Sequence, residues 1–181
     1  MTASDSAIVR RVLDGDTEAF AVLVTRYHPA CVRLATHALG TREDAEDAVQ
    51  ETFLRAYRHL GRYEERERFA GWLFRILVNQ CRTTLARRRR GETHVAEGAG
   101  EPASWDEDVA EGAERDEMLR TALARLHPLQ REAVLLRFSA DLSYEEMAAA
   151  TGAGVSALKM RVKRACAHLQ DLLREGSDVR P

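Results

Sequence analysis

The sequence predicts an all-α fold of two small helical domains joined by a flexible acidic linker. Apolar residues recur at spacings of three, four and seven along most of the 181 residues, whereas period-two alternation is nearly absent. A chain of this length accommodates one ordinary domain or two small ones. Residues 91–113 combine glycine, proline, serine and acids with very few large apolar side chains, so burial there cannot repay the entropy of ordering. We therefore expect domains at 10–90 and 114–175, with the linker at 91–113 between them.

Two helices are expected at the start of the first domain. The first follows Asp16, a candidate N-cap, and ends at Gly40, with a kink or restart at Pro29 because proline removes a helical N–H. The second covers about residues 42–60 and ends at Gly61. Its acids lie in the first turns, where they interact favourably with the helix dipole.

The third helix runs from about Phe69 through the arginines at 87–90 and carries a stripe that suits single-stranded nucleic acid. The stripe lies apart from the apolar core face and consists of Arg68, Trp72, Arg75, Asn79 and Arg82. An aromatic ring can stack an unpaired base, an amide can read its edge, and arginines can hold phosphates. Core packing is the equally weighted alternative for Phe69 and Trp72. A frayed basic helix end is the alternative to phosphate contact for the arginines at 87–90.

The second domain should open with two helices. One covers about residues 118–126, and Pro128 occupies the first position of the next, where its missing N–H costs nothing. The expected core of this second helix is Val134, Leu135 and Phe138.

The last two helices are typical of a helix-turn-helix, in which the second helix enters the major groove of DNA. Ser143 and Glu146 form a capping box that starts a short helix, and 151–155 forms a glycine turn before Ser156 caps the final helix. Opposite its apolar stripe this helix carries Lys159, Met160, Lys163 and Arg164, with Arg161 beside them. The alternative is an ordinary helical hairpin with a solvated basic face.

The charge distribution indicates an anionic partner. The net charge is only -2, but residues 55–90 hold eleven arginines against three glutamates, and 153–170 holds four bases and no acid. Ten acids and one arginine lie between these segments, at 91–117. Two basic segments with an acidic connector make nucleic acid the first partner to consider.

A polar face of the second helix is a candidate docking surface. Its members are Asp44, Asp47, Gln50 and Glu51. From the residues alone, docking to a partner and simple solvation are equally supported. No close pairing makes these carboxylates a catalytic dyad or a metal site.

Signals for catalysis, cofactors and membranes are missing from the sequence. There is no GxxxxGK, GxGxxG, HExxH or GxSxG motif, and Cys31, Cys81 and Cys166 have no metal-ligand spacing. No run approaches the roughly 18 apolar residues of a membrane span, and the N-terminus has no signal-peptide pattern. We expect a cytoplasmic protein that is not an enzyme and needs no cofactor or metal.

Four segments together resemble a bacterial sigma factor of the extracytoplasmic-function (ECF) group in the sigma-70 family. They are GDTEAF at 15–20, DAEDAVQETFLRAY at 44–57, FAGWLFRILVNQCR at 69–82 and LSYEEMAAATGAGVSALKMRVKRA at 142–165. The resemblance covers most of residues 10–175 in matching order and spacing. It implies a minimal sigma factor with a sigma-2 domain, a sigma-4 domain and a variable linker.

The resemblance also implies residue roles. The polymerase-binding positions are Asp44, Asp47, Gln50 and Glu51. The positions for minus-ten DNA, whose bases are captured in the melted state, are Arg62, Phe69, Trp72, Arg75, Asn79, Arg82, Arg87 and Arg88. The positions for minus-thirty-five DNA are Arg137, Ser156, Lys159, Met160, Arg161, Lys163 and Arg164.

The implied partners are core RNA polymerase, through its β′ clamp helices and β flap, promoter DNA and an anti-sigma factor, without membrane insertion. A stand-alone helix-turn-helix regulator is the main rival, but it assigns no function to the aromatic and amide stripe at 69–82. An all-helical adaptor protein is a third possibility.

Overall fold

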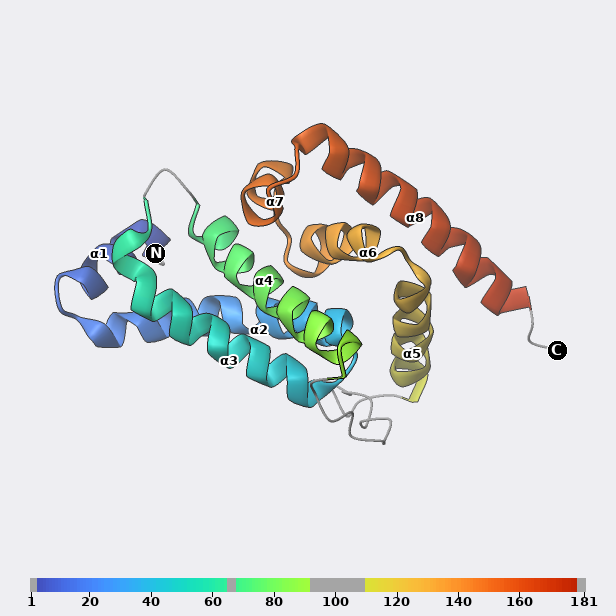
Figure 1. Cartoon of the computed structure of the whole chain (residues 1–181), viewed down its shortest axis with the longest axis horizontal. Helices are drawn as coiled ribbons and strands as arrows, with labels where there is room; N and C mark the ends of the chain where they lie inside the picture. The colour runs from blue at the N-terminus through green and yellow to red at the C-terminus, as the bar shows by residue number, and fades with distance from the viewer. Residues whose placement is uncertain (1–2, 65–67, 92–109, 179–181) are drawn as a thin grey trace.

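The computed structural model describes residues 3–64, 68–91 and 110–178, and every regular element within these ranges is a helix. Four α-helices within these ranges form an N-terminal half and four more form a C-terminal half. Figure 1 shows the two halves beside each other. The expected all-α class is confirmed. The acidic linker expected at 91–113 lies largely outside the described residues, although its last four residues already belong to a helix that begins at Ala110.

The N-terminal half begins with α1 (Asp5–Leu13), a helix that the sequence patterns did not reveal. The Ser4 hydroxyl accepts a hydrogen bond from the Ala7 N–H, and Ile8, Val9 and Val12 are buried. A helix of nine residues is marginal on its own, so packing of this apolar face must stabilise it.

Helix α2 (Phe20–Leu39) continues through Pro29 without interruption, so the helix does not restart there. Pro29 is exposed, so water can solvate the carbonyl that lacks a helical partner, while buried side chains on the opposite face hold the helix together. Asp16 caps a 3-10 turn (Thr17–Ala19) ahead of α2 rather than α2 itself. Gly40 ends the helix as expected, in the left-handed conformation at φ 82°.

The core of the N-terminal half forms where α2 packs against α3 (Arg42–His59) and α4 (Phe69–Arg89). Both helices match the expected segments closely. The buried side chains of α4 repeat at helical spacing and include Phe69, Leu73, Phe74 and Leu77. The polar face of α3 and the stripe of α4 are thus fixed to one rigid bundle.

The C-terminal half contains α5 (Ala110–Arg125), α6 (Pro128–Val134), α7 (Tyr144–Thr151) and α8 (Val155–Asp178). Pro128 occupies the first turn of α6, and the Ser143–Glu146 capping box is formed, as expected. Ser156 lies inside the first turn of α8 rather than at its N-cap, because the helix already begins at Val155.

Phe138 is 64% exposed, which corrects its expected place in the core. A π-helical turn (Leu135–Ser139) follows α6, and its wider winding rotates Phe138 away from the face that Val134 and Leu135 bury. Phe138 was expected in the core because it follows Val134 at the spacing of an α-helix, and that spacing does not apply in a π-helical turn.

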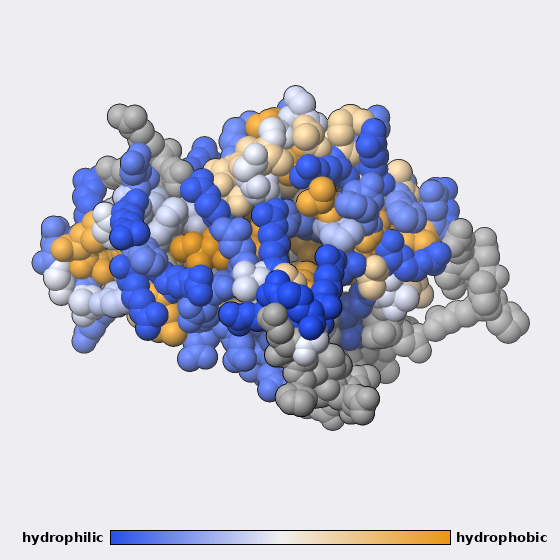
Figure 2. Space-filling view, viewed as in Figure 1, coloured by the Kyte–Doolittle hydropathy of each residue, from blue (hydrophilic) through white to orange (hydrophobic). Residues whose placement is uncertain are grey.

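The two halves pack against each other. Helix α7 lies along α4, and the π-helical turn after α6 contacts α2, so buried residues of both halves form one apolar cluster. Figure 2 shows one face of this assembly, which is mainly hydrophilic with apolar patches between the polar side chains. The packing determines which of the candidate functional side chains reach solvent.

Candidate nucleic-acid interface

The arginines of the α4 stripe face the C-terminal half. Arg75 Nε donates a hydrogen bond of 2.6 Å to the Ala149 carbonyl on α7. Arg82 forms a bidentate pair with Glu132 on α6, at 2.9 and 2.7 Å. Arg68, just before α4, lies 3.5 Å from a Glu146 carboxylate oxygen. Three cations expected to hold phosphates therefore have protein acceptors in this arrangement.

The aromatic residues of the stripe belong to a cluster at the start of α4. Phe69 is 1% exposed and lies between Tyr27 and Tyr63, with ring centroids at 5.5 and 5.7 Å. This burial corrects the expectation that Phe69 contacts DNA. Trp72 is half-buried and contacts both Phe69 and Tyr63, so one part of its indole packs on the core while another reaches the surface.

Asn79 is exposed on α4, between the two engaged residues Arg75 and Arg82. Its backbone carbonyl accepts a hydrogen bond from the Thr83 hydroxyl at 2.8 Å, and its side chain lies at the surface. An exposed amide on a cationic helix face has the donor and acceptor groups needed to read a base edge.

Arg88 and Asp44, expected on two different surfaces, form an ion pair with each other. Arg88 also donates to the Leu39 carbonyl at 2.7 Å and to the Thr41 hydroxyl at 3.0 Å. These contacts tie the end of α4 to the turn before α3, and both side chains thereby help to hold the bundle. Arg62 and Arg87 are exposed.

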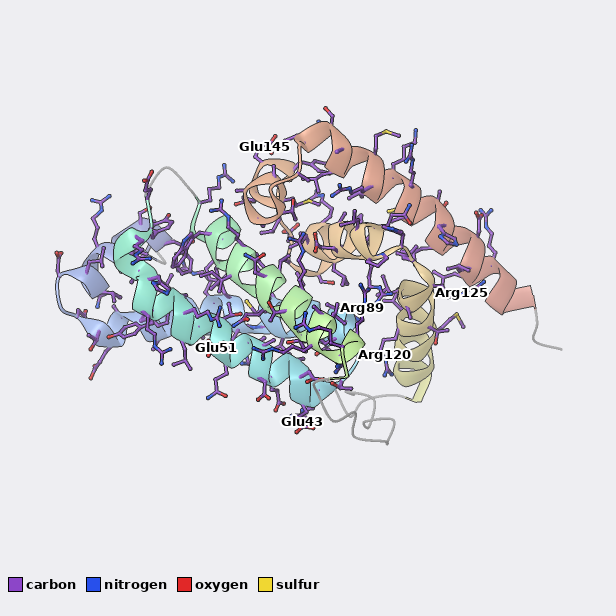
Figure 3. The ribbon with its side chains drawn as sticks, viewed as in Figure 1. Glu43, Glu51, Arg89, Arg120, Arg125 and Glu145 are labelled. Carbon is purple, nitrogen blue, oxygen red and sulfur yellow. The ribbon has the colours of Figure 1, made fainter. Side chains whose placement is uncertain are left out.

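The outer face of α3 combines acids with an apolar groove. Asp47 and Gln50 are exposed, and Figure 3 places Glu43 and Glu51 on the same helix. The hydrogen bond from Arg55, at 2.6 Å, lowers the pKa of the Glu51 carboxyl from its usual value, so Glu51 stays ionised. Gln50 borders a groove of about 420 Å³ whose apolar lining includes Phe20, Val49, Phe53, Leu54 and Tyr57.

Leu54 and Tyr57, each 43% exposed, are surface residues that the sequence analysis missed. They follow Gln50 at i+4 and i+7, so the three side chains share one helix face. That spacing could have revealed them, since two large apolar groups on an otherwise polar face favour partner binding over solvation.

The exposed basic face of α8 is held by a rigid helix-turn-helix. Gly152 ends α7 at φ 74°. Helix α8 buries Leu158, Val162 and Ala165, and it packs on α5, α6 and α7. The opposite face exposes Ser156, Lys159, Met160, Lys163 and Arg164, and Arg161 is half-buried beside them. The structure thus brings six of the seven expected groove-facing residues onto one helix.

Arg137, the seventh, lies before α7 and has a local structural contact. Its guanidinium donates to the Leu142 carbonyl at 2.9 Å and lies 5.7 Å from the centre of the Tyr144 ring. The Lys159 ammonium lies 5.6 Å from the same ring. Tyr144 therefore links the π-helical turn to the N-terminal part of α8 through cation–π contacts.

The described residues contain no group of three or more histidine, cysteine or acidic side chains that could hold a metal. Burial raises the pKa of the Cys31 thiol, and it raises that of Cys81 to about 12, so both thiols stay protonated at neutral pH. In the parts of the chain that the structure describes, every helix is too short or too polar to span a bilayer.

Two family models match the chain, sigma-70 region 2 over residues 23–91 and sigma-70 region 4 over residues 116–169. The RNA polymerase sigma factor NccH of Alcaligenes xylosoxydans xylosoxydans is 37% identical, over 94% of this chain and 95% of its own. The ECF RNA polymerase sigma-E factor of Haemophilus influenzae is 34% identical, over 90% of this chain and 91% of its own.

Two solved structures are similar over nearly the whole chain. CnrH, in complex with the cytosolic domain of CnrY, superposes with a TM-score of 0.75 at 27% identity, covering 96% of this chain and 99% of CnrH. The sigma factor RpoE, in complex with the anti-sigma factor NepR from Bartonella quintana, gives a TM-score of 0.70 at 29% identity, covering 86% and 96%.

Proposed function

This chain belongs to the sigma-70 family as an ECF sigma factor that directs RNA polymerase to promoters, and we propose that its two halves read two different forms of promoter DNA. Residues 10–90 form a sigma-2 domain that docks on polymerase and holds the melted minus-ten element. Residues 114–175 form a sigma-4 domain that binds the minus-thirty-five duplex, and 91–113 link them.

The exposed cationic face of α8 is the observation that carries this proposal. Lys163 and Arg164 lie on the side of a packed recognition helix that faces away from its core, where long donor side chains can reach base edges in the major groove. Lys159 and Arg161 lie beside them and hold phosphates, which adds affinity without sequence preference.

The sigma-2 domain supplies the second contact. Asn79 reads an unpaired base that Trp72 stacks, while Arg62 and Arg87, together with stripe arginines freed from their protein acceptors, hold the strand backbone. Taking a base out of the stack costs a few kcal/mol and stacking returns roughly 1–3 kcal/mol, so polymerase binding must supply the remainder.

The α3 face docks on the β′ clamp helices of core polymerase. Gln50 and Glu46 border the apolar groove that Leu54 and Tyr57 help to line, and Asp47 is exposed on the same helix, which gives a small apolar centre with polar and acidic side chains around it. The sigma-4 domain contacts the β flap. The stand-alone regulator is not favoured, because the sigma-70 matches include region 2 as well as region 4.

We expect Asp47→Arg to weaken binding to core polymerase by about 1–3 kcal/mol, because it reverses an exposed charge at the rim of the docking face. Affinity titration against purified core polymerase measures the loss. Glu43→Arg is the matched control, since Glu43 is exposed on the same helix nearer its first turn. Equal binding by Asp47→Arg and the parent chain would contradict the docking assignment.

The family fold implies no reaction, and the chain acts by binding polymerase and DNA in the cytoplasm without a cofactor. An anti-sigma factor is the expected regulator. RpoE was solved with the anti-sigma factor NepR, and its superposition on this chain supports a similar kind of partner here.

A further inference from the structure

The α4 stripe that the proposed function assigns to minus-ten DNA is also the surface on which α6 and α7 pack. Its arginines make three contacts across the two halves: Arg68 with Glu146, Arg75 with the Ala149 carbonyl, and Arg82 with Glu132. We refer to these three contacts as the latch. Carboxylate and carbonyl oxygens, the acceptors in these contacts, engage guanidinium groups that could otherwise bind phosphate oxygens.

We propose that the sigma-4 domain masks the minus-ten surface of the same chain, so that the closed form is self-inhibited until the halves separate. This inference rests on the proposed function of the α4 stripe. Single-stranded DNA and the acceptors on α6 and α7 compete for the same guanidinium groups. The affinity of the free chain for the melted strand is therefore reduced by the fraction of molecules that are closed.

Close helix packing makes the masking steric as well as electrostatic. Gly71 on α4 faces α7, and a Cβ built there would lie 3.4 Å from the Glu146 carbonyl oxygen and 3.5 Å from the Ala149 Cβ. Backbones this near leave no room for a nucleotide between α4 and α7. A base can reach the first turns of α4 along this face only after α7 has moved.

The two ion pairs of the latch are individually weak. The Arg68 side chain is 77% exposed and that of Arg82 is 44% exposed, so water and salt screen both ion pairs. At the latch the interface is imperfectly packed, because a partly open cavity of about 420 Å³ lies between α2, α4 and α6. Apolar residues such as Val78 and Leu85 line it together with Arg82 and Glu132. Opening also exposes part of the apolar cluster that the two halves share, so the halves separate when a partner offers better contacts.

The relative placement of the halves also resembles that in a solved complex. CnrH bound to the cytosolic domain of CnrY superposes over 96% of this chain with a TM-score of 0.75, which requires both halves to overlay together. The latch residues all belong to this chain. Its own side chains thus stabilise an arrangement that a bound regulator would only need to reinforce.

The test compares Glu132→Arg with Glu145→Arg in the full chain. Glu132 faces Arg82, so reversal of its charge opposes closure, whereas Glu145 is exposed on α7 and its reversal adds the same charge outside the latch. Small-angle X-ray scattering without DNA measures the radius of gyration. Fluorescence anisotropy with a single-stranded minus-ten oligonucleotide, without polymerase, measures affinity at low salt.

We expect Glu132→Arg to have a larger radius of gyration than the parent chain and to bind the oligonucleotide about fivefold more tightly, as the closed fraction falls. Glu145→Arg should match the parent chain in dimensions and gain less affinity. Glu132→Gln keeps the shape of the side chain and removes only its charge. It should therefore raise the radius of gyration and the oligonucleotide affinity by less than Glu132→Arg does. Far-UV circular dichroism confirms that helices are retained, and Glu132→Gln replaces Glu132→Arg if the latter does not fold.

Three results would overturn the inference. The first is unchanged dimensions in both Glu132 variants, and the second is an equal affinity gain in Glu145→Arg, which would assign the effect to net charge. The third is expansion without an affinity gain, which would show that the latch exists but does not compete with DNA. In that case the minus-ten assignment of the stripe fails while the closed arrangement stands.

Discussion

Phe74→Ala is expected to lower the free energy of unfolding by about 3–5 kcal/mol, the largest effect of any single change considered for this chain. Phe74 is fully buried on α4, where α2 and α3 pack against that helix. Truncation removes the buried ring and leaves a cavity that a helical bundle cannot fully collapse. Urea denaturation followed by circular dichroism measures the change.

Leu54→Ala is the control for this prediction, because Leu54 is a large apolar side chain that is 43% exposed on α3. Its truncation should change stability by no more than about 0.5–1 kcal/mol. A loss below about 1 kcal/mol for Phe74→Ala would show that α4 is not anchored as the structure describes.

Asn79→Ala is expected to reduce open-complex formation by about 1–3 kcal/mol at promoters with the preferred minus-ten base, and much less at promoters that lack it. The substitution removes a base-edge contact, while the arginines that hold phosphates remain. Permanganate footprinting on a panel of minus-ten variants, with core polymerase present, measures the open fraction.

Thr83→Ala is the matched control for Asn79. Thr83 is exposed on α4, and its hydroxyl bonds to the Asn79 carbonyl, so its loss alters the helix surface without removing the amide. If Asn79→Ala reduces opening equally on every minus-ten sequence, then Asn79 has a structural role and does not read a base.

Helical periodicity and caps were sufficient to predict most elements of the fold. Gly40, Pro128 and the Ser143–Glu146 capping box act locally, through backbone conformation and hydrogen bonds within a few residues, and all three appear where the sequence places them. Helix α1 was missed because nine residues give a weak periodic signal and its stability comes from tertiary burial.

The features that depend on long-range packing could not be predicted from patterns. A π-helical turn exposes Phe138, and an aromatic cluster buries Phe69, although both residues fit the local helical period. The pairing of Arg82 with Glu132 joins residues 50 positions apart. The sequence shows that both residues are charged, but it does not show that they form a pair with each other.

The candidate surfaces also differ in how far local sequence predicts them. The basic face of α8 follows directly from its spacing, because one helix presents all of its members. The α4 stripe was also correct as a helix face, but its engagement by α6 and α7 depends on how the two halves pack.

Promoter-specific transcription with this chain as the sole sigma factor is the most direct test of its proposed function. Purified core polymerase, the chain and a library of promoter fragments are combined, and the start sites of the transcripts are mapped. We predict defined starts that require the chain and that share both a minus-thirty-five and a minus-ten element. Absence of such starts, together with tight sequence-specific duplex binding in the absence of polymerase, would contradict this function.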